Sequence, residues 1–341
     1  MTGLQRDLGF IPRLEALRGL AAVSVVAYHA FGQFIDSHVT GLAPVVLFFV
    51  LSGFVLARSL ARGPTIGEFF RHRVFRLFPA AIAVVLLLTA LHAQFGFYVG
   101  FLPDFSTVNV LMNALMLKHD INGPMWSMTV EILATPLILL SFWICRRHGW
   151  RTMLPFAMIL FGLSFIGPYV HLLGGFSNLA PLYAFIAGVM LHFAGSELVK
   201  SSRDSSVWIA ALFSGALLLY CGFQKQTAPI ILLETISSGG LIAIISFAPI
   251  SLFSFLDAGV SRFFGQVSYS FYLLHLIGLS VALRITSIAG WPVASALLTA
   301  VLAVALTTPL AWLSWRYIER PFVRWGRSFR QATQVAPEPA A

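Results

Sequence analysis

The feature that most constrains this chain is a series of apolar runs, each about 20 residues long, the length that an α-helix needs to cross a bilayer. Polar segments separate the runs, and the stretch 101–119 is apolar but too interrupted to be counted with them. We expect that stretch to be an interfacial or re-entrant helix. The pattern predicts an all-α, polytopic membrane protein with about ten transmembrane helices, at 14–35, 42–61, 78–97, 125–145, 152–172, 178–194, 206–223, 229–249, 266–289 and 292–315.

Charge content excludes the common soluble classes of protein. Only 10% of the 341 residues are charged, and 58% are hydrophobic, whereas a soluble domain carries about 25% charged residues. A cytosolic enzyme, a secreted disulfide scaffold and a disordered chain are therefore excluded, and the main partner is a lipid bilayer. The net charge of +9 does not indicate nucleic acid, because the basic residues lie between apolar runs. The two cysteines, Cys145 and Cys221, show no metal-binding spacing, and nothing indicates an oligomeric state.

The distribution of basic residues predicts how the chain crosses the membrane. With a cytoplasmic N-terminus, 19 of the 22 Lys and Arg residues fall in cytoplasmic segments, and Lys118, Lys225 and Arg284 fall on the other side. Positive residues accumulate on the cytoplasmic side of membrane proteins. Both termini are therefore predicted to be cytoplasmic, and residues 331–341 are predicted to form a disordered tail.

The first predicted helix carries two polar side chains on one face. Arg18 and His29 are 11 positions apart, which brings them to within about 20° of each other around the helix and separates them by about 16 Å along it. Two interpretations remain open. Arg18 either extends to the headgroups while His29 bonds a neighbouring helix, or both line a passage through the membrane.

An acidic residue in the fourth predicted helix bears on this choice. Glu131 lies about 10 Å along that helix from its start near Pro124, which predicts a depth similar to that of His29. A carboxylate beside an imidazole can fix its tautomer or stabilise the imidazolium. The alternative is a structural pair that only holds two helices together.

The loop before the third predicted helix is unusually rich in arginine. Arg71, Arg73 and Arg76 are interleaved with Phe residues just before Pro79, which suggests a helix lying at the membrane surface. Guanidinium groups there can bind phosphates in a bidentate manner. A topology signal that also contacts anionic lipid is the alternative.

These segments, in this order, resemble the acyltransferase 3 family of integral-membrane O-acyltransferases. The likeness extends from about residue 11 to 322, and the domain would occupy residues 1–330. Six motifs in register carry it: Arg18 with His29, FFVLSGF at 48–54, Arg73-x-x-Arg76-Leu77-x-Pro79, Trp126-Ser127 with Glu131, GQVSYSFYLLH at 265–275, and Tyr317-x-Glu319-Arg320-Pro321.

The resemblance implies transfer of an acyl group from cytoplasmic acyl-coenzyme A, with acetyl-CoA the expected co-substrate, to a hydroxyl of an extracytoplasmic carbohydrate or glycolipid. It implies a bacterial inner-membrane location, a catalytic His29, and donor binding by Arg73 and Arg76. Where the family is often basic this chain has His72, so Arg71 is a candidate substitute.

On this basis three groups of site residues are expected. His29 would act as general base or as nucleophile, with Glu131 and Arg18 completing the catalytic set. The donor would be held by Arg71, Arg73 and Arg76, and the acceptor by Trp126 and Ser127. No metal is expected. The alternative function is a transporter of an acylated or anionic solute that uses Arg18, His29 and Glu131 as a binding and proton-relay site, although the chain lacks the paired repeats of many transporters.

Overall fold

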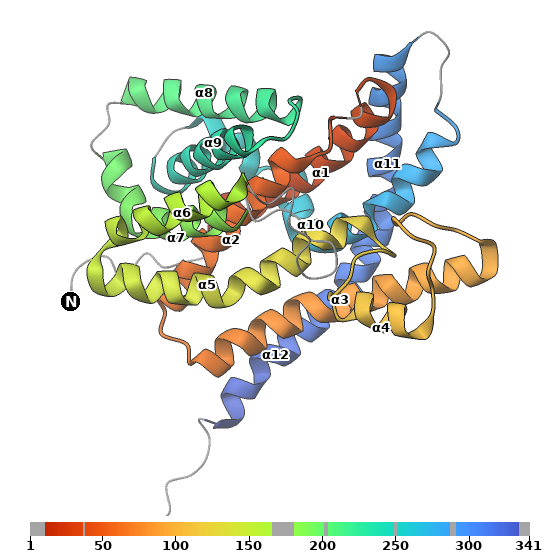
Figure 1. Ribbon diagram of the computed structural model, residues 1–341, viewed down its shortest axis with the longest axis horizontal. Helices are drawn as coiled ribbons and strands as arrows, with labels where there is room; N and C mark the ends of the chain where they lie inside the picture. Colours follow the sequence, from red (N-terminus) through yellow and green to blue (C-terminus); the bar gives the residue numbers. More distant parts are fainter. Residues whose placement is uncertain are drawn as a thin grey trace, which may run out of the picture.

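The computed structural model describes residues 11–36, 38–165, 181–200, 204–248, 251–286 and 291–333, and every regular element within these ranges is helical. The longer helices cross one another in a single bundle (Figure 1). In chain order the elements are α1 (Pro12–Phe34), α2 (Leu42–Leu60), α3 (Ile66–Phe95), α4 (Thr107–Ala114), η2 (Gly123–Met125), α5 (Trp126–His148), η3 (Trp150–Met153), α6 (Leu154–Ser164), α7 (Pro181–Lys200), α8 (Asp204–Gly222), α9 (Ala228–Phe247), η5 (Ser251–Asp257), α10 (Gly259–Leu283), α11 (Pro292–Ser314), η6 (Trp315–Glu319) and α12 (Arg320–Thr333).

The predicted fold class is confirmed. Among the described residues, nine helices are long and apolar enough to cross a membrane, and they correspond to nine of the ten predicted spans. The remaining prediction, 152–172, begins in η3 and α6, and its end lies outside the described ranges. The stretch 101–119 contains only the eight-residue α4, which is too short to span a bilayer.

Close helix contacts in the bundle depend on small residues. The α1–α10 crossing brings the backbones of Gly19 and Gly265 together, and at the α2–α7 crossing Gly53 lies against the carbonyl oxygen of Phe185. Helices in lipid gain little from burying apolar surface, so their association depends on such close packing and on polar contacts. These two crossings hold α1, α2, α7 and α10 around a shared core.

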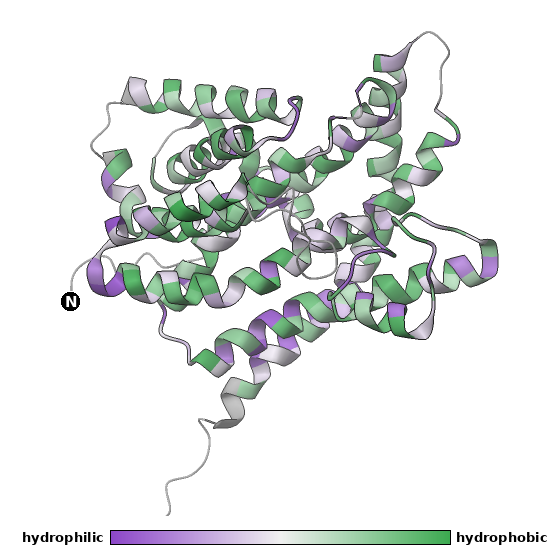
Figure 2. Ribbon diagram, viewed as in Figure 1, coloured by the Kyte–Doolittle hydropathy of each residue, from purple (hydrophilic) through white to green (hydrophobic). Residues whose placement is uncertain are grey.

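The outer surface of the bundle is suited to lipid. Large apolar side chains are exposed along the outer helices, including Phe213 on α8 and Val301 on α11, at 65% exposure each. Figure 2 shows apolar colour over most of the helices, while polar residues gather on α12 and on the adjoining start of α3. An apolar exterior of this extent is stable only in a bilayer or a detergent that replaces it.

The predicted surface helix around Arg71 is instead the first part of α3, a continuous 30-residue helix that starts at a capping box on Thr65 and Glu68. The helix α12 lies alongside this part (Figure 1). Arg71 Nε donates to the carbonyl oxygen of Gly326 at 3.1 Å, and Phe75 packs on Trp325 with 5.1 Å between ring centroids. Of the predicted tail, residues 331–333 continue α12 and the rest lies outside the described ranges.

Replacing Gly53 with Ala is expected to destabilise the α2–α7 crossing. The new methyl group would overlap the backbone of Phe185, and such overpacking costs about 1–3 kcal/mol. Gly215→Ala on α8 is the matched control, because nothing lies within 4 Å of a Cβ at that position. Alanine there is expected to be neutral or stabilising. Thermal stability measured by size-exclusion chromatography in detergent separates the two variants, and equal stability would contradict the close crossing.

The orientation predicted from charge can be tested with single cysteines. With the two buried cysteines, Cys145 and Cys221, replaced by Ser, we expect His38→Cys in the α1–α2 loop to react with a membrane-impermeant maleimide in intact spheroplasts. Arg324→Cys on α12 should react only after the membrane is disrupted. The reverse labelling pattern would invert the topology.

Candidate active site

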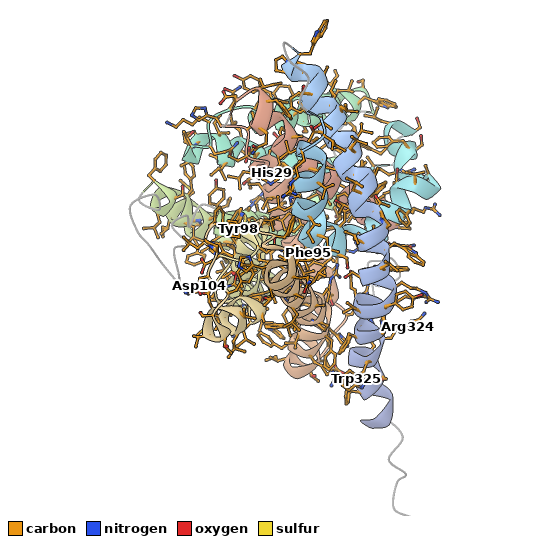
Figure 3. All side chains as sticks on the ribbon, turned by 90° about the vertical axis from the view of Figure 1, so that its right-hand side faces the viewer. His29, Phe95, Tyr98, Asp104, Arg324 and Trp325 are labelled. Carbon is orange, nitrogen blue, oxygen red and sulfur yellow. The ribbon has the colours of Figure 1, made fainter. Side chains whose placement is uncertain are left out.

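His29 lies on the wall of a partly open cavity of about 410 Å³. Figure 3 labels His29 on α1, together with Tyr98 and Asp104 on the segment that leads to α4. His29 makes no hydrogen bond to any described residue, so its ring nitrogens remain available to a bound molecule. The cavity lies between α1, the start of α2, the segment before α4, the approach to α5, and α10; its lining includes Val25, Thr40, Val99, Phe101, His119, Trp126 and Tyr272.

A second histidine, His275 on α10, stacks on the His29 ring with 5.4 Å between centroids and 14° between planes. Its Nδ1 lies 2.6 Å from the carbonyl oxygen of Tyr272, so Nδ1 carries the proton and donates. His275 is completely buried and therefore contacts His29 rather than the cavity. This contact of His275 with His29 was not predicted from the sequence. The sequence does contain a pattern that could have indicated it: Tyr272 and His275 are polar residues three positions apart in an apolar helix, so they lie on one face.

The two residues predicted to bind the acceptor have different positions. Trp126 lines the cavity. Ser127 does not, because it is 1% exposed and its hydroxyl lies 2.9 Å from the Tyr272 hydroxyl. The Tyr272 hydroxyl also donates to the carbonyl oxygen of Pro124 at 3.1 Å. Ser127 thus fixes a wall residue, Tyr272, instead of forming the wall.

The expected pairing of Glu131 with His29 is wrong, because Glu131 bonds to other residues. Glu131 Oε1 accepts hydrogen bonds from Arg73 Nη2 at 3.1 Å and from Ser52 Oγ at 2.9 Å. This contact is an ion pair in which the Arg73 and Glu131 side chains are 10% and 18% exposed. Glu131 therefore belongs with the arginines of α3 and not with the imidazole of α1.

Glu131 does not reach the depth predicted for it because α5 begins inside the bundle. Asn122, just before this helix, donates from Nδ2 to the carbonyl oxygen of Leu273 at 2.9 Å. Leu273 is ten residues before the end of α10 at Leu283, or about 15 Å along that helix. Because α5 starts at this depth and not at the membrane border, Glu131 is displaced beyond His29 toward the arginine-rich end.

At that end, Arg18, Arg73 and Arg76 form a cluster with the half-buried carboxylate of Glu131 and the buried carboxylate of Glu319. Arg18 interacts electrostatically with Glu131, Glu319 and Arg76, and Arg76 in turn with Glu319. Glu319 also accepts a hydrogen bond from Ser270 Oγ at 2.9 Å. Within the described ranges neither Arg18 nor Arg76 makes a hydrogen bond, so their donors can bind an anion.

The predicted site residues thus fall into two groups at opposite ends of α1. An imidazole faces a cavity at one end, and guanidinium groups with unused donors lie about 16 Å away along the helix. Arg71 belongs to neither group, since its guanidinium lies over the Phe329 ring of α12, 5.6 Å from its centroid. Within the described ranges no three His, Cys, Asp or Glu side chains could hold a metal ion. The arrangement suits general-base or nucleophilic chemistry on a molecule whose anionic part is bound at the far end.

The fold and the site together define a multi-pass membrane protein with an imidazole on the wall of a cavity and a cluster of arginines toward the other end of the same helix. The profile of a family described as "Acyltransferase domain" matches residues 11–316, and the chain belongs to this family, acyltransferase 3. It is therefore a membrane acyltransferase.

Three relatives illustrate the similarity. Acyltransferase MdmB of Streptomyces mycarofaciens is 25% identical, and the alignment covers 97% of this chain and 96% of the relative. Peptidoglycan O-acetyltransferase OatA of Listeria monocytogenes is 24% identical over 94% of this chain, and O-acetyltransferase OatA of Staphylococcus aureus is 25% identical over 93%. The chain spans 58% of the length of each OatA protein. No solved structure matches.

Breaking the Arg73–Glu131 pair from one side is expected to be costly. Arg73→Met leaves the Glu131 carboxylate buried without its cation, which typically costs about 3–5 kcal/mol. The double variant Arg73→Met/Glu131→Gln should recover much of the lost stability, because the uncompensated charge is gone. Thermal melting of the single and double variants in detergent measures the coupling. Additive losses would show that the pair does not stabilise the bundle.

Proposed function

We propose that this protein transfers an acyl group, most simply acetyl, from cytoplasmic acyl-CoA to a hydroxyl of a carbohydrate or glycolipid outside the bacterial inner membrane. The observation that carries the proposal is the unbonded His29 ring on the wall of a cavity, on the same helix as the unbonded guanidinium of Arg18. A family of acyltransferases supplies the reaction class.

Donor binding is assigned to the arginine-rich end. Coenzyme A carries several phosphates, and arginine binds phosphate in a bidentate manner. Among the described residues Arg18 and Arg76 have unused donors. Arg71 lies apart from them, against α12, but its buried Nη2 has no partner within the described ranges and is proposed to contact another phosphate of the same donor. Arg73 is held by Glu131, so it contributes positive charge and keeps Glu131 in place. In this proposal the nucleotide binds here and the acyl-pantetheine arm extends along α1 toward His29.

The chemical step is assigned to His29. It acts either as general base, taking the proton of the acceptor hydroxyl as that oxygen attacks the thioester, or as nucleophile, accepting the acyl group first. Stacking on the buried His275 fixes the plane of the His29 ring. Trp126 forms part of the wall against which the acceptor binds, and Ser127 acts through Tyr272.

The proposed acceptor rests on the residues that line the cavity and on the activities named for two relatives. Trp126, Tyr272 and Phe101 offer aromatic surface around His29, and such rings with a few polar groups are typical of small-molecule pockets. Two relatives are named O-acetyltransferases, one of them a peptidoglycan O-acetyltransferase. An extracytoplasmic glycan hydroxyl agrees with both observations.

Mass analysis of envelope glycans tests the proposal. A strain lacking the gene is complemented with the wild type, with His29→Ala, or with the control His38→Ala, whose ring is exposed and paired with Asp36. We expect a base-labile mass increment with the wild type and the control, reduced at least about 100-fold in His29→Ala, the scale of one acid–base group. An increment that survives in His29→Ala would remove His29 from the chemistry. No increment in any strain, with the protein present in the membrane, would contradict a glycan acceptor.

A further inference from the structure

A second imidazole lines the cavity that contains His29. His119, in the segment between α4 and η2, faces the same space of about 410 Å³, which is about 9 Å wide if it is taken as a sphere. Nothing in the proposed function uses His119. Two histidines in a cavity of this size can both contact one small substrate.

The segment that carries His119 is held firmly on both sides. The carbonyl oxygen of Asp120 accepts a hydrogen bond from the Phe101 amide at 2.8 Å, and Asn113 Oδ1 accepts one from the Ile121 amide at 3.1 Å. Asn122 then joins the segment to α10, and the Phe101 ring packs edge-on to the imidazole at 6.1 Å. The position of His119 is therefore set by the fold and not by a free loop.

The His119 ring is available as a base. It makes no hydrogen bond to any described residue, and its Nδ1 is buried, which leaves Nε2 as the nitrogen that a ligand can reach. Burial lowers the pKa of His119 below its ordinary value, and the nearby Asp120 only partly opposes this effect. This direction favours the neutral imidazole, the form that holds a lone pair on one ring nitrogen.

We propose that the two histidines divide the reaction: His29 carries the acyl group, and His119 is the general base that takes the proton of the acceptor hydroxyl. The inference rests on the proposed function and deepens it, because it selects the covalent route. It also assigns the acceptor half of the reaction to residues of the segments before and after α4 that line the cavity.

The two half-reactions balance. In the first, the lone pair of a His29 ring nitrogen attacks the thioester carbonyl; the C–N bond forms, the C–S bond breaks, and the thiolate leaves and takes a proton from the cytoplasm. In the second, the acceptor oxygen attacks the same carbonyl carbon. The C–O bond forms, the C–N bond breaks and returns the lone pair to His29, and the hydroxyl proton moves to His119 Nε2. His119 then releases that proton outside.

The positions of His29 and His119 in the fold decide which of them carries the acyl group and which acts as the base. His29 is on the helix that leads to Arg18 and the proposed donor site. His119 instead precedes Asp120, whose carbonyl oxygen accepts from the amide of Phe101, in the segment that carries Tyr98 (Figure 3). A single imidazole that carries the acyl group has lost its lone pair and cannot deprotonate the acceptor. A second base in the same cavity removes this conflict.

The test uses membranes that contain the full chain, [¹⁴C]acetyl-CoA as donor and envelope glycan from the deletion strain as acceptor. We expect His119→Gln to form labelled protein but to discharge it to glycan about 100-fold to 10,000-fold more slowly, the range for loss of a general base. Exchange of free CoA into acetyl-CoA needs only the first half-reaction, so it should remain at the wild-type rate and show that the variant is folded. His38→Gln is the control for an exposed histidine outside the cavity.

Three results would overturn the inference. Discharge from His119→Gln at the wild-type rate would remove the second base. Wild-type turnover without labelled protein, or without the CoA exchange, would leave the proposed function standing but contradict the covalent route. Equal loss of exchange and of discharge in both His119→Gln and His119→Asn would show a structural role for this side chain. If the wild type transfers no label to any acceptor, the proposed function fails and this inference fails with it.

Discussion

The ion pair between Arg73 and Glu131 is the interaction on which the arrangement of this protein most depends. It joins α3 to α5 inside an apolar bundle, and Ser52 on α2 contributes a third helix to the same carboxylate. A carboxylate at this depth without a cation would be costly. Because Arg73 satisfies Glu131, the neighbouring Arg18 and Arg76 keep their hydrogen-bond donors, and the cluster can bind an anion while remaining stable.

The depth at which α5 begins is the second feature that determines the arrangement of the site. Asn122 bonds to the middle of α10, and Thr129 Oγ1 bonds to the carbonyl oxygen of Met116 at 2.8 Å. The chain between α4 and α5 is thereby drawn into the bundle, where Thr129 satisfies the carbonyl oxygen of Met116 and Asn113 Oδ1 accepts from the Ile121 amide, as irregular structure at membrane depth requires. This entry creates the cavity, since it brings His119 and Trp126 opposite His29.

Much of the fold was predictable because the bilayer limits what an apolar chain can do. Runs of about 20 apolar residues can only be helices across it, so nine spans were placed correctly before any tertiary contact was known. The relation between Arg18 and His29 was likewise predictable, since both lie on one regular helix. The surface helix around Arg71 was wrong in one respect: the amphipathic stretch and the following span form the single helix α3, and α12 covers its polar part.

The sequence by itself determined which segments are long and apolar enough to cross a membrane, the periodicity that aligns Arg18 with His29, and the family motifs that mark a membrane acyltransferase. Only the tertiary structure decided the partners of those residues. Glu131 pairs with Arg73 because α5 starts deep in the bundle, and His275 reaches His29 because α10 packs against α1 through Gly19 and Gly265. Helix periodicity is a local property of the chain, whereas the depth and rotation of one helix against another depend on packing between segments far apart in sequence.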